Sequence, residues 1–454
     1  MNTHTSLTSS KIIARLFSAT LAILMAAGIP ASSLKAEETT PETELNVTDI
    51  LSLKERLNSY EDALPDKDKL GMNRIIAYDE SRDFTYVLGT TSSSVRRIVC
   101  LKPSTLIISD VLTDDSKPGK LVLRTKGKTE ISKGRIRIGD GESSTICETV
   151  VPTETEVENA QDDNAVEVSP RKAYIIPFIY LLYPDDDKDR APSVRLTGTQ
   201  WFPVLEIKAN GKLYTLALPP EQGAPGTVSI TKDDGEEVLA RRLLASGILP
   251  HGRGAKMVEG WDRNYHNNKR PPWDTWRVAN ELKRVVENGA IKPCRAVVLG
   301  CGTGTNARYL ADEGFDVTAI ELAPTALVRA TARSAETGSV VRWMLADVLN
   351  PPDMKPFDFI FDRGCYHNVR KHDAAGFVKA LCKMSHPGTS TLIIAGSAKE
   401  GKRRGPPMVK EEDIRKDFSS SFEFTWLNDI RFDLGMHEPM EKGPMAWSIM
   451  LEKK

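Results

Sequence analysis

Cysteine and net charge are both scarce in this sequence. Its 454 residues include six cysteines at irregular spacing, with no C-x-x-C pair, and the formal net charge is −1. So few cysteines exclude a disulfide-rich scaffold and a paired-cysteine metal site. No group of His, Cys or Asp residues has metal-ligand spacing, so no metal is expected. A near-zero net charge gives no general attraction to nucleic acid, and no nucleic-acid partner is expected.

Acidic residues are absent from residues 1–36. Lys11 and Arg15 precede an uncharged run, 16–29, which is shorter than the roughly 20 apolar residues of a membrane-spanning helix. This pattern is typical of a secretory signal peptide, cleaved within 31–37. We therefore expect an exported protein, periplasmic or secreted. An uncleaved anchor and a misassigned start codon are the alternatives, and the second would leave the protein in the cytoplasm.

Short β-prone runs separated by turn residues dominate residues 37–250. Asn210-Gly211 lies between two of them and predicts a hairpin. Many short strands are typical of a β-sandwich, so an all-β, sandwich-like domain is expected here. The acidic stretch 153–170 is predicted to be a solvated loop. The β-prone runs include 75–78, 84–88, 97–101, 106–108, 121–125 and 135–138.

The runs 84–87, 97–103 and 106–110 resemble, in order and type, the C-terminal β-domain of heparinase II/III-type proteins. The resemblance implies a non-catalytic β-domain that contacts polysaccharide, and no catalytic residue is carried over. Cys100 and Cys147 lie in or beside strand-like runs of this half. They would form a disulfide if the chain is exported, or two buried free thiols, and both readings stay open.

The stretch 297–306, VVLGCGTGTN, combines a buried-strand pattern, three glycines and a helix start. Glycines let the backbone approach a ligand closely at the carboxyl end of a strand. Glu321 ends the next apolar run and lies 21 residues after Gly300. An acidic residue at this distance is placed to accept hydrogen bonds from ribose hydroxyls.

These residues resemble class I S-adenosylmethionine-dependent methyltransferases, and the resemblance covers about the last 195 residues. The spacing G-x-G-x-G favours S-adenosylmethionine over NAD, for which G-x-G-x-x-G is usual. Asp362-Arg363-Gly364 and Trp273-Asp274 further resemble thiopurine S-methyltransferases. One departure is Val298, where many family members carry an acid.

Strands and helices alternate from Thr275 onward, which predicts a parallel sheet in a Rossmann-like methyltransferase domain, 255–454. A linker is expected at 251–256, with irregular structure after it. Expected strands are 296–299, 317–321, 341–345, 357–361 and 391–395, with a terminal hairpin from 422–432 and 446–451. Expected helices are 276–288, 306–313, 325–336 and 374–384.

The resemblance assigns most candidate residues to the cofactor. Glu321 would hold the ribose, Asp347 the adenine amine, and Trp273 would lie in a segment folded over the site. Asp362 would face the methionine ammonium or the acceptor, and His367 and Tyr366 are candidates for proton exchange. A structural role for His367 is the alternative. The cofactor candidates are Leu299, Gly300, Cys301, Gly302, Gly304, Asn306, Glu321, Leu322, Asp347, Val348, Asp362 and Trp273.

The resulting hypothesis is methyl transfer from S-adenosylmethionine to a small molecule, with a thiol or another soft nucleophile as acceptor. The competing hypothesis is an exported polysaccharide-binding protein whose methyltransferase-like domain is inactive. Its motivation is the signal peptide, because S-adenosylmethionine is made in the cytoplasm.

Overall fold

The structure is a computed structural model, and it is described here over most of the chain beyond residue 41. The described residues are 42–53, 57, 64–113, 119–132, 135–139, 144–160, 165–171, 177–185, 191–199, 202–219, 226–268, 270–400, 405–434 and 443–454. The predicted signal peptide, 1–36, lies outside them. No helix in the described part is long and apolar enough to cross a membrane.

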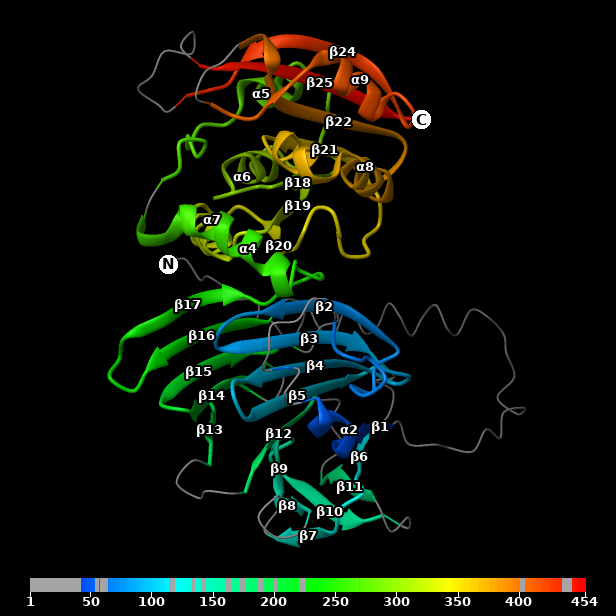
Figure 1. Ribbon diagram of the computed structural model, residues 1–454, viewed down its shortest axis with the longest axis vertical. Coiled ribbons are helices and arrows are strands. Elements are labelled where there is room, and N and C mark those ends of the chain that lie inside the picture. Colours follow the sequence, from blue (N-terminus) through cyan, green and yellow to red (C-terminus); the bar gives the residue numbers. More distant parts are fainter. Residues whose placement is uncertain are drawn as a thin grey trace, which may run out of the picture. The chain divides into compact units, whose positions relative to one another are not determined.

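Strands, most of them paired antiparallel, make up most of the first half of the described chain (Figure 1). An eight-stranded sheet has the order β2-β3-β4-β5-β12-β9-β8-β7, and a five-stranded sheet has the order β13 to β17. The strands of the first are β2 (Arg74–Glu80), β3 (Phe84–Thr90), β4 (Ser94–Leu101), β5 (Thr105–Leu112), β7 (Thr129–Ser132), β8 (Arg135–Ile138), β9 (Thr145–Val151) and β12 (Phe178–Pro184). Those of the second are β13 (Ser193–Leu196), β14 (Val204–Ala209), β15 (Lys212–Ala217), β16 (Thr227–Lys232) and β17 (Glu237–Leu243).

The hairpin predicted at Asn210-Gly211 is confirmed, since β14 and β15 pair on either side of it. Asn210 has φ 55° and Gly211 has φ 69°, the left-handed values that a tight two-residue turn requires. Cys100 and Cys147 are buried free thiols. The structure therefore agrees with the free-thiol alternative and not with a disulfide.

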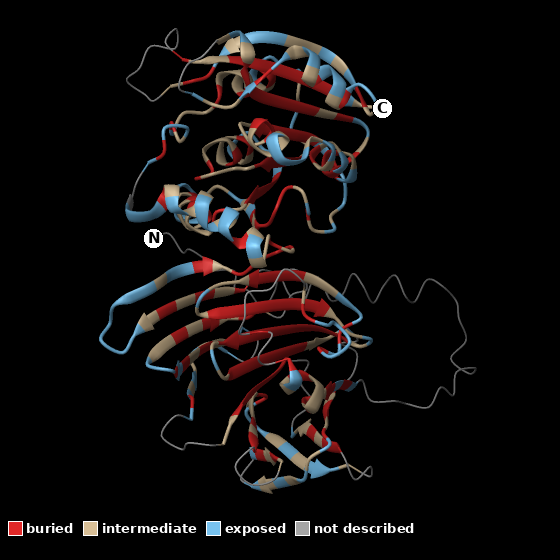
Figure 2. Cartoon of the chain, in the orientation of Figure 1, coloured by how far each residue is buried: buried red, intermediate tan, exposed pale blue. Residues whose placement is uncertain are grey.

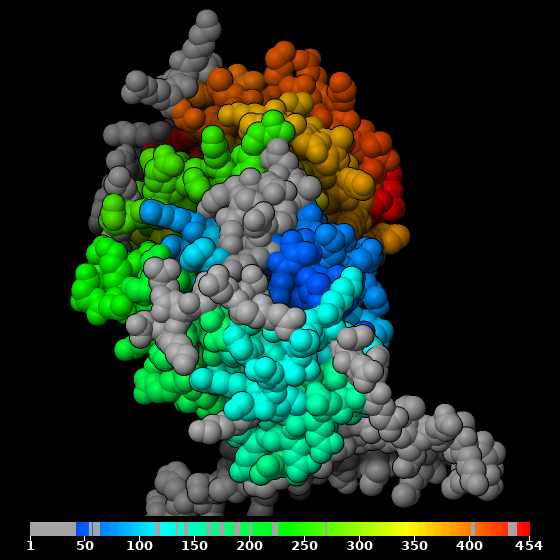
Figure 3. Space-filling model, turned by 60° about the horizontal axis from the view of Figure 1, so that its bottom comes forward, coloured from blue at the N-terminus to red at the C-terminus, as the bar shows by residue number. Residues whose placement is uncertain are grey.

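A four-stranded sheet, β1-β6-β11-β10, contains the acidic stretch that was predicted to be a loop. That prediction was wrong: β10 (Thr155–Asn159) and β11 (Ala165–Pro170) pair antiparallel. The alternate apolar residues Val166 and Val168 are fully buried, while the acidic residues lie between them. The blue segment with β1 (Glu42–Asn46) and α2 (Val47–Ser52) lies beside the cyan one with β6 (Lys120–Arg124), with which β1 pairs (Figure 3).

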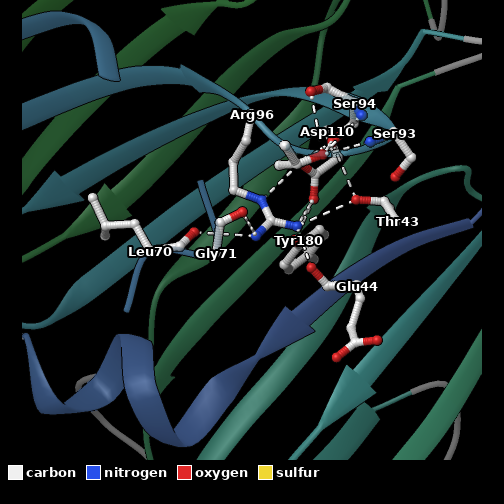
Figure 4. Close-up of polar contacts among 10 residues, drawn as sticks. Thr43, Glu44, Leu70, Gly71, Ser93, Ser94, Arg96, Asp110 and Tyr180 are labelled. Atoms are coloured by element: carbon white, nitrogen blue, oxygen red, sulfur yellow. Dashed lines mark hydrogen bonds and ion pairs between the residues drawn. The ribbon is translucent and has the colours of Figure 1, made fainter. Parts of the chain in front are cut away.

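A buried arginine joins β1 to the eight-stranded sheet (Figure 4). Arg96 is fully buried, and its Nε donates to Asp110 Oδ1 at 2.8 Å. Its Nη2 donates to Asp110 Oδ2 and to the carbonyl oxygen of Glu44, and Tyr180 donates to Asp110 at 2.7 Å. The charges are paired and hydrogen-bonded, which is the condition for burying them. The network thereby fixes β1 against β4, β5 and β12.

Helical structure replaces the predicted linker and the irregular segment after it. The chain forms η3 (Gly252–Gly254), α4 (Ala255–Asp262) and η4 (Arg263–Asn268) before α5 (Asn280–Glu287). The helices form in spite of the flanking Trp and Pro residues because Pro271 and Pro272 fall after η4, where they interrupt no helical hydrogen bond.

A mostly parallel sheet forms the second half, in the order β20-β19-β18-β21-β22-β25-β24, with β23 beside β22. The last pair is an antiparallel hairpin, as predicted. The strands are β18 (Arg295–Leu299), β19 (Asp316–Glu321), β20 (Val341–Leu345), β21 (Phe357–Arg363), β22 (Ser385–Ser397), β23 (Met408–Val409), β24 (Phe422–Arg431) and β25 (Met445–Lys453). The helices are α6 (Thr305–Asp312), α7 (Pro324–Thr337), α8 (Tyr366–Met384) and α9 (Glu411–Phe418), and η5 (Ala398–Glu400) follows β22.

The central strands of this sheet are buried on both faces, as the red strands β18 and β21 show in Figure 2. Alternate residues of a strand face opposite sides. Ala296 and Val298 therefore share a core with α5, α6 and α7, whereas Val297 and Leu299 share one with α8 and α9. Burial on both faces explains the unbroken apolar runs in the sequence.

The expected order of a β-rich half followed by an α/β half is confirmed by the element order. Strand 341–345 has the predicted bounds, and α6 and α7 differ from the prediction by one residue at each end. Helix α8 begins eight residues early and is broken at Asp373, whose φ is −154°. The sandwich-like packing of the first half and the domain boundaries 37–250 and 255–454 stay predictions.

Candidate active site

The glycine loop turns tightly between β18 and α6. Gly300, Gly302 and Gly304 have φ values of 57°, 55° and 82°, where only glycine is unstrained. A Cβ atom at Gly300 would lie 2.9 Å from the Cβ of Cys365, and one at Gly304 would lie 2.4 Å from the Trp343 ring. The spacing of glycines in the sequence thus reflects both backbone conformation and close packing.

Glu321 holds the glycine loop to the end of β19. Its Oε2 accepts from the backbone N–H of Gly302 at 2.8 Å, and its Oε1 accepts from those of Leu322 and Ala323, both at 2.9 Å. Burial raises the pKa of the Glu321 carboxyl, although the three backbone hydrogen bonds act in the opposite direction. The side chain lines a cavity, and Oε2 has a second lone pair for a ligand hydroxyl.

Asp347 lies two residues after the end of β20, and like Glu321 its carboxylate accepts from a backbone N–H group. Its Oδ1 accepts from the backbone N–H of Leu349 at 2.9 Å, and Asn350 Nδ2 lies 3.4 Å from Oδ2. Burial raises the pKa of this carboxyl also. Asp347 and Val348 line the same cavity as Glu321. Asp347 therefore both shapes a turn and faces the cavity.

The segment before α5 folds over the glycine loop. Trp273 Nε1 donates to the hydroxyl of Tyr265 at 3.1 Å, and the carboxylate of Asp274 accepts from the Thr303 hydroxyl at 2.9 Å. Tyr265 is buried, while 44% of Trp273 is exposed. All four residues line the cavity. The sequence predicted that Trp273 lies in a segment folded over the cofactor; Trp273 lines the cavity, and its contact with a cofactor stays a prediction.

Two candidate residues at the end of β21 and the start of α8, Asp362 and Tyr366, are not among the residues that line the cavity. Asp362 is fully buried, and its carboxylate accepts from the backbone N–H groups of Cys365 at 3.0 Å and Tyr366 at 2.8 Å. The Tyr366 hydroxyl donates to Asp417 at 2.7 Å. Because the first N–H groups of α8 need acceptors, Asp362 is used to hold this turn. Contact of Asp362 or Tyr366 with a ligand was expected, and their placement outside the cavity lining corrects that expectation.

His367 does reach the cavity. Its Nδ1 accepts from the backbone N–H of Gly396 at 2.9 Å, so the ring proton lies on Nε2. Burial, with Lys371 and Arg363 nearby, lowers the pKa of this imidazole to about 3. The ring is therefore neutral at pH 7, and its Nε2–H is a donor. This geometry does not fit the proton acceptor that the sequence suggested.

The cavity has a volume of about 850 Å³. Ten of the twelve cofactor candidates line it; of the other two, Gly304 packs against Trp343 and Asp362 accepts from the backbone at the start of α8. The ten are Trp273, Leu299, Gly300, Cys301, Gly302, Asn306, Glu321, Leu322, Asp347 and Val348. Sequence reasoning missed Tyr265, Phe432 and Asp433, which also line it. Tyr265 lies in a Trp/Tyr-rich stretch that could have pointed to it, whereas nothing local marks Phe432 and Asp433.

Comparison with known proteins gives a family match over the second half. Residues 257–444 match the model of thiopurine S-methyltransferase (TPMT). The chain is 26% identical over 151 residues to the 2-heptyl-1-hydroxyquinolin-4(1H)-one methyltransferase of Mycobacteroides abscessus, covering 32% of this chain and 66% of that relative. It is 24% identical over 187 residues to the probable thiol methyltransferase 2 of Arabidopsis thaliana, covering 40% of this chain and 82% of that relative.

Solved structures show more distant likeness. One described as "Conversion of a Disulfide Bond into a Thioacetal Group during Echinomycin Biosynthesis" has 22% identity and a TM-score of 0.39, covering 44% of this chain and 92% of that one. The match to TPMT does not reach the first half, so its heparinase II/III resemblance stays a prediction. The second half, with its glycine loop and Glu321, is a TPMT-like domain, and the protein is an S-adenosylmethionine-dependent methyltransferase.

Proposed function

We propose that this methyltransferase acts on a small-molecule acceptor whose nucleophile is soft, with a thiol as the leading candidate. The observation that carries the proposal is one cavity that holds the cofactor residues and continues to the end of β21. Glu321 and Asp347 lie at its cofactor side, and His367, Phe432 and Asp433 line it as well. Its volume of about 850 Å³ is in the range of small-molecule sites.

The residues present fit S-adenosylmethionine. Two buried carboxyl groups end neighbouring parallel strands, and the glycine loop beside them presents backbone that no Cβ atom covers. Glu321 would accept from the ribose hydroxyls and Asp347 from the adenine amine. When bound, the cofactor supplies an electrophilic methyl group on a sulfonium sulfur.

The chain's own residues act by holding and enclosing the reactants. Tyr265 lies beside the glycine loop, with its hydroxyl 3.4 Å from where a Cβ of Gly302 would be, and it accepts from Trp273 Nε1. Arg363 Nη1 donates to the carbonyl oxygen of Trp273 at 3.0 Å. The bound cofactor would supply the methyl group and leave as a neutral thioether, so an ionised acceptor would need no base. Orientation and exclusion of water are then the main contributions of the protein.

A soft acceptor is supported by the family and by the states of His367, Cys301 and Cys365 in the cavity. The matched family is described by its S-methyltransferase activity, and one relative is named a probable thiol methyltransferase. In this cavity His367 is neutral with Nδ1 engaged, and burial raises the pKa of the thiols of Cys301 and Cys365. None of these groups suits removal of a proton from an alcohol, whereas a thiol ionises unaided near neutral pH.

The test is an acceptor panel with radiolabelled methyl donor and the full-length chain. The panel contains thiophenol, hydrosulfide, 6-mercaptopurine, phenol and a 1-hydroxyquinolin-4-one. We expect transfer to at least one sulfur acceptor and a much slower reaction with phenol. Transfer to the oxygen acceptors alone would contradict the proposal.

For the first half we propose export and a contact with polysaccharide. Support comes from the charge pattern of residues 1–36 and the β-rich runs that resemble heparinase II/III-type proteins. Fractionation of cells that express the full chain, followed by chromatography on an acidic polysaccharide, tests both. Recovery in the cytoplasm at full length contradicts export, and passage through the column contradicts the contact.

A further inference from the structure

The ring of Phe432 contacts two polar side chains, His367 and Arg363, near the end of β21. Phe432 stands edge-on to His367, with ring centroids 6.0 Å apart, and the Arg363 guanidinium lies 5.5 Å from the centroid of the same ring. Asp433 is the next residue. The three side chains of His367, Phe432 and Asp433 all line the cavity.

His367 faces this space as a donor. The backbone N–H of Gly396 can only donate, so Nδ1 must be the unprotonated nitrogen. Among the described residues no acceptor is hydrogen-bonded to Nε2, which lies 3.4 Å from where a Cβ of Gly364 would be. Burial, and then the neighbouring cations Lys371 and Arg363, lower the pKa of the ring and so disfavour a second proton on it.

Asp433 lines the same space and has an acceptor oxygen without a partner in the described part of the chain. Only 6% of the residue is exposed, and its Oδ2 accepts from the backbone N–H of Asn280 at 3.1 Å. Its Oδ1 is buried and has no hydrogen-bond partner within the described ranges. Arg363 Nη2 donates to the backbone carbonyl of Asp433 at 3.2 Å, which fixes the residue at the cavity. A buried oxygen without a partner is costly, and a ligand N–H or O–H would remove that cost.

We propose that His367 and Asp433 form the acceptor subsite, in which His367 Nε2–H donates to an electron-rich atom of the acceptor and Asp433 Oδ1 accepts from an N–H or O–H group elsewhere on it. The acceptor is then a flat, electron-rich ring compound that carries a hydrogen-bond donor and packs on Phe432. This proposal rests on the proposed function. His367 is in this account a positioning residue.

The tautomer is tested without turnover. Long-range ¹H–¹⁵N correlation spectra of the full-length chain distinguish the two neutral tautomers and the cation, and His367→Gln identifies the signals of His367. We expect the Nε2–H form throughout pH 6 to 8. Titration in that range, or the Nδ1–H form, overturns the role of His367 as a donor.

The subsite is tested with thiophenol and its 2-, 3- and 4-amino derivatives as acceptors of the full-length enzyme. We expect His367→Leu to lower kcat/KM by roughly 10-fold or more and His367→Gln, which keeps a donor, to restore most of the loss. At least one amino derivative should be preferred over thiophenol, and Asp433→Asn should reduce that preference by about 10-fold. The surface variant His386→Gln is the matched control.

The outcomes separate the two proposals. Equal activity of the Gln and Leu variants overturns the role of His367, and an unchanged preference in Asp433→Asn overturns that of Asp433. Calorimetric binding of the probes to the enzyme saturated with S-adenosylhomocysteine should show the same order. If the wild-type chain methylates another sulfur acceptor but none of these thiophenols, the subsite proposal fails alone. If it methylates no sulfur acceptor, the proposed function fails as well.

Discussion

The Glu321 carboxylate accepts a hydrogen bond from the backbone N–H of Gly302 at 2.8 Å. The bond joins the end of β19 to the glycine loop that follows β18. The residue proposed to bind ribose therefore also sets the conformation of the neighbouring loop. Loss of the carboxylate should weaken the cofactor in two ways: one ligand contact disappears, and the loop loses its anchor.

Glu321→Gln tests this coupling. A glutamine amide cannot accept at both positions, so one of three backbone donors loses its partner. We expect S-adenosylhomocysteine binding to weaken by at least about 10-fold and the free energy of unfolding to fall by about 1–3 kcal/mol. Calorimetry and urea denaturation measure these. Glu313→Gln, at the exposed end of α6, is the control and should change neither.

Gly304→Ala should destabilise the domain through a steric contact. The new Cβ would lie 2.4 Å from the Trp343 ring, at a φ of 82°. Gly338 has a similar φ of 75°, but no atom lies within 4 Å of its Cβ position. Gly338→Ala therefore carries only the backbone cost of about 1 kcal/mol, and Gly304→Ala should cost roughly 1–3 kcal/mol more. Equal losses in denaturant would show that packing against Trp343 is unimportant.

Asp362 should make stability depend on pH. Burial raises the pKa of its carboxyl from 3.8 to about 7, despite backbone hydrogen bonds that lower it. The folded chain then binds a proton that the unfolded chain has lost between about pH 4 and 7, so this contribution to the free energy of unfolding falls as pH rises through that window. Its size is at most of the order of 4 kcal/mol. Denaturant curves at pH 5, 6, 7 and 8 should show a smaller slope with pH in Asp362→Asn; an identical slope would exclude Asp362 as the source.

Removing one charge of the buried pair of Arg96 and Asp110 should lower the free energy of unfolding far more than removing one charge of an exposed pair. Asp110→Asn leaves a buried guanidinium without its counter-charge and should cost about 3–5 kcal/mol of unfolding free energy. Glu411 and Arg415 form an exposed pair at 2.8 Å, and Glu411→Gln should cost less than about 0.5 kcal/mol. Thermal denaturation of both variants checks the contrast. A small effect at Asp110 would mean that water reaches Arg96.

Features encoded by neighbouring residues were predictable from the sequence. The glycine loop, the acid ending β19 and the period of α7 each depend on one short stretch, so their positions were found within a residue or two. The stretch 153–170 was misread because its charges suggested a loop, while Val166 and Val168 alternate as a strand buried on one face requires.

The acceptor end of the cavity was not predictable, since tertiary pairing alone creates it. Asp433 follows β24 and reaches the site only because that strand pairs with β25, which pairs with β22. The expected ligand contact of Asp362 was wrong for a similar reason. The sequence places it at the end of a central strand, but only the start of α8 shows that its oxygens are occupied.

Calorimetric titration of S-adenosylhomocysteine into the full-length chain tests the central claim most directly. The account predicts one site with micromolar affinity that Glu321→Ala abolishes. A chain that shows a cooperative unfolding transition yet binds no S-adenosylhomocysteine would contradict it, as would unchanged binding in the variant.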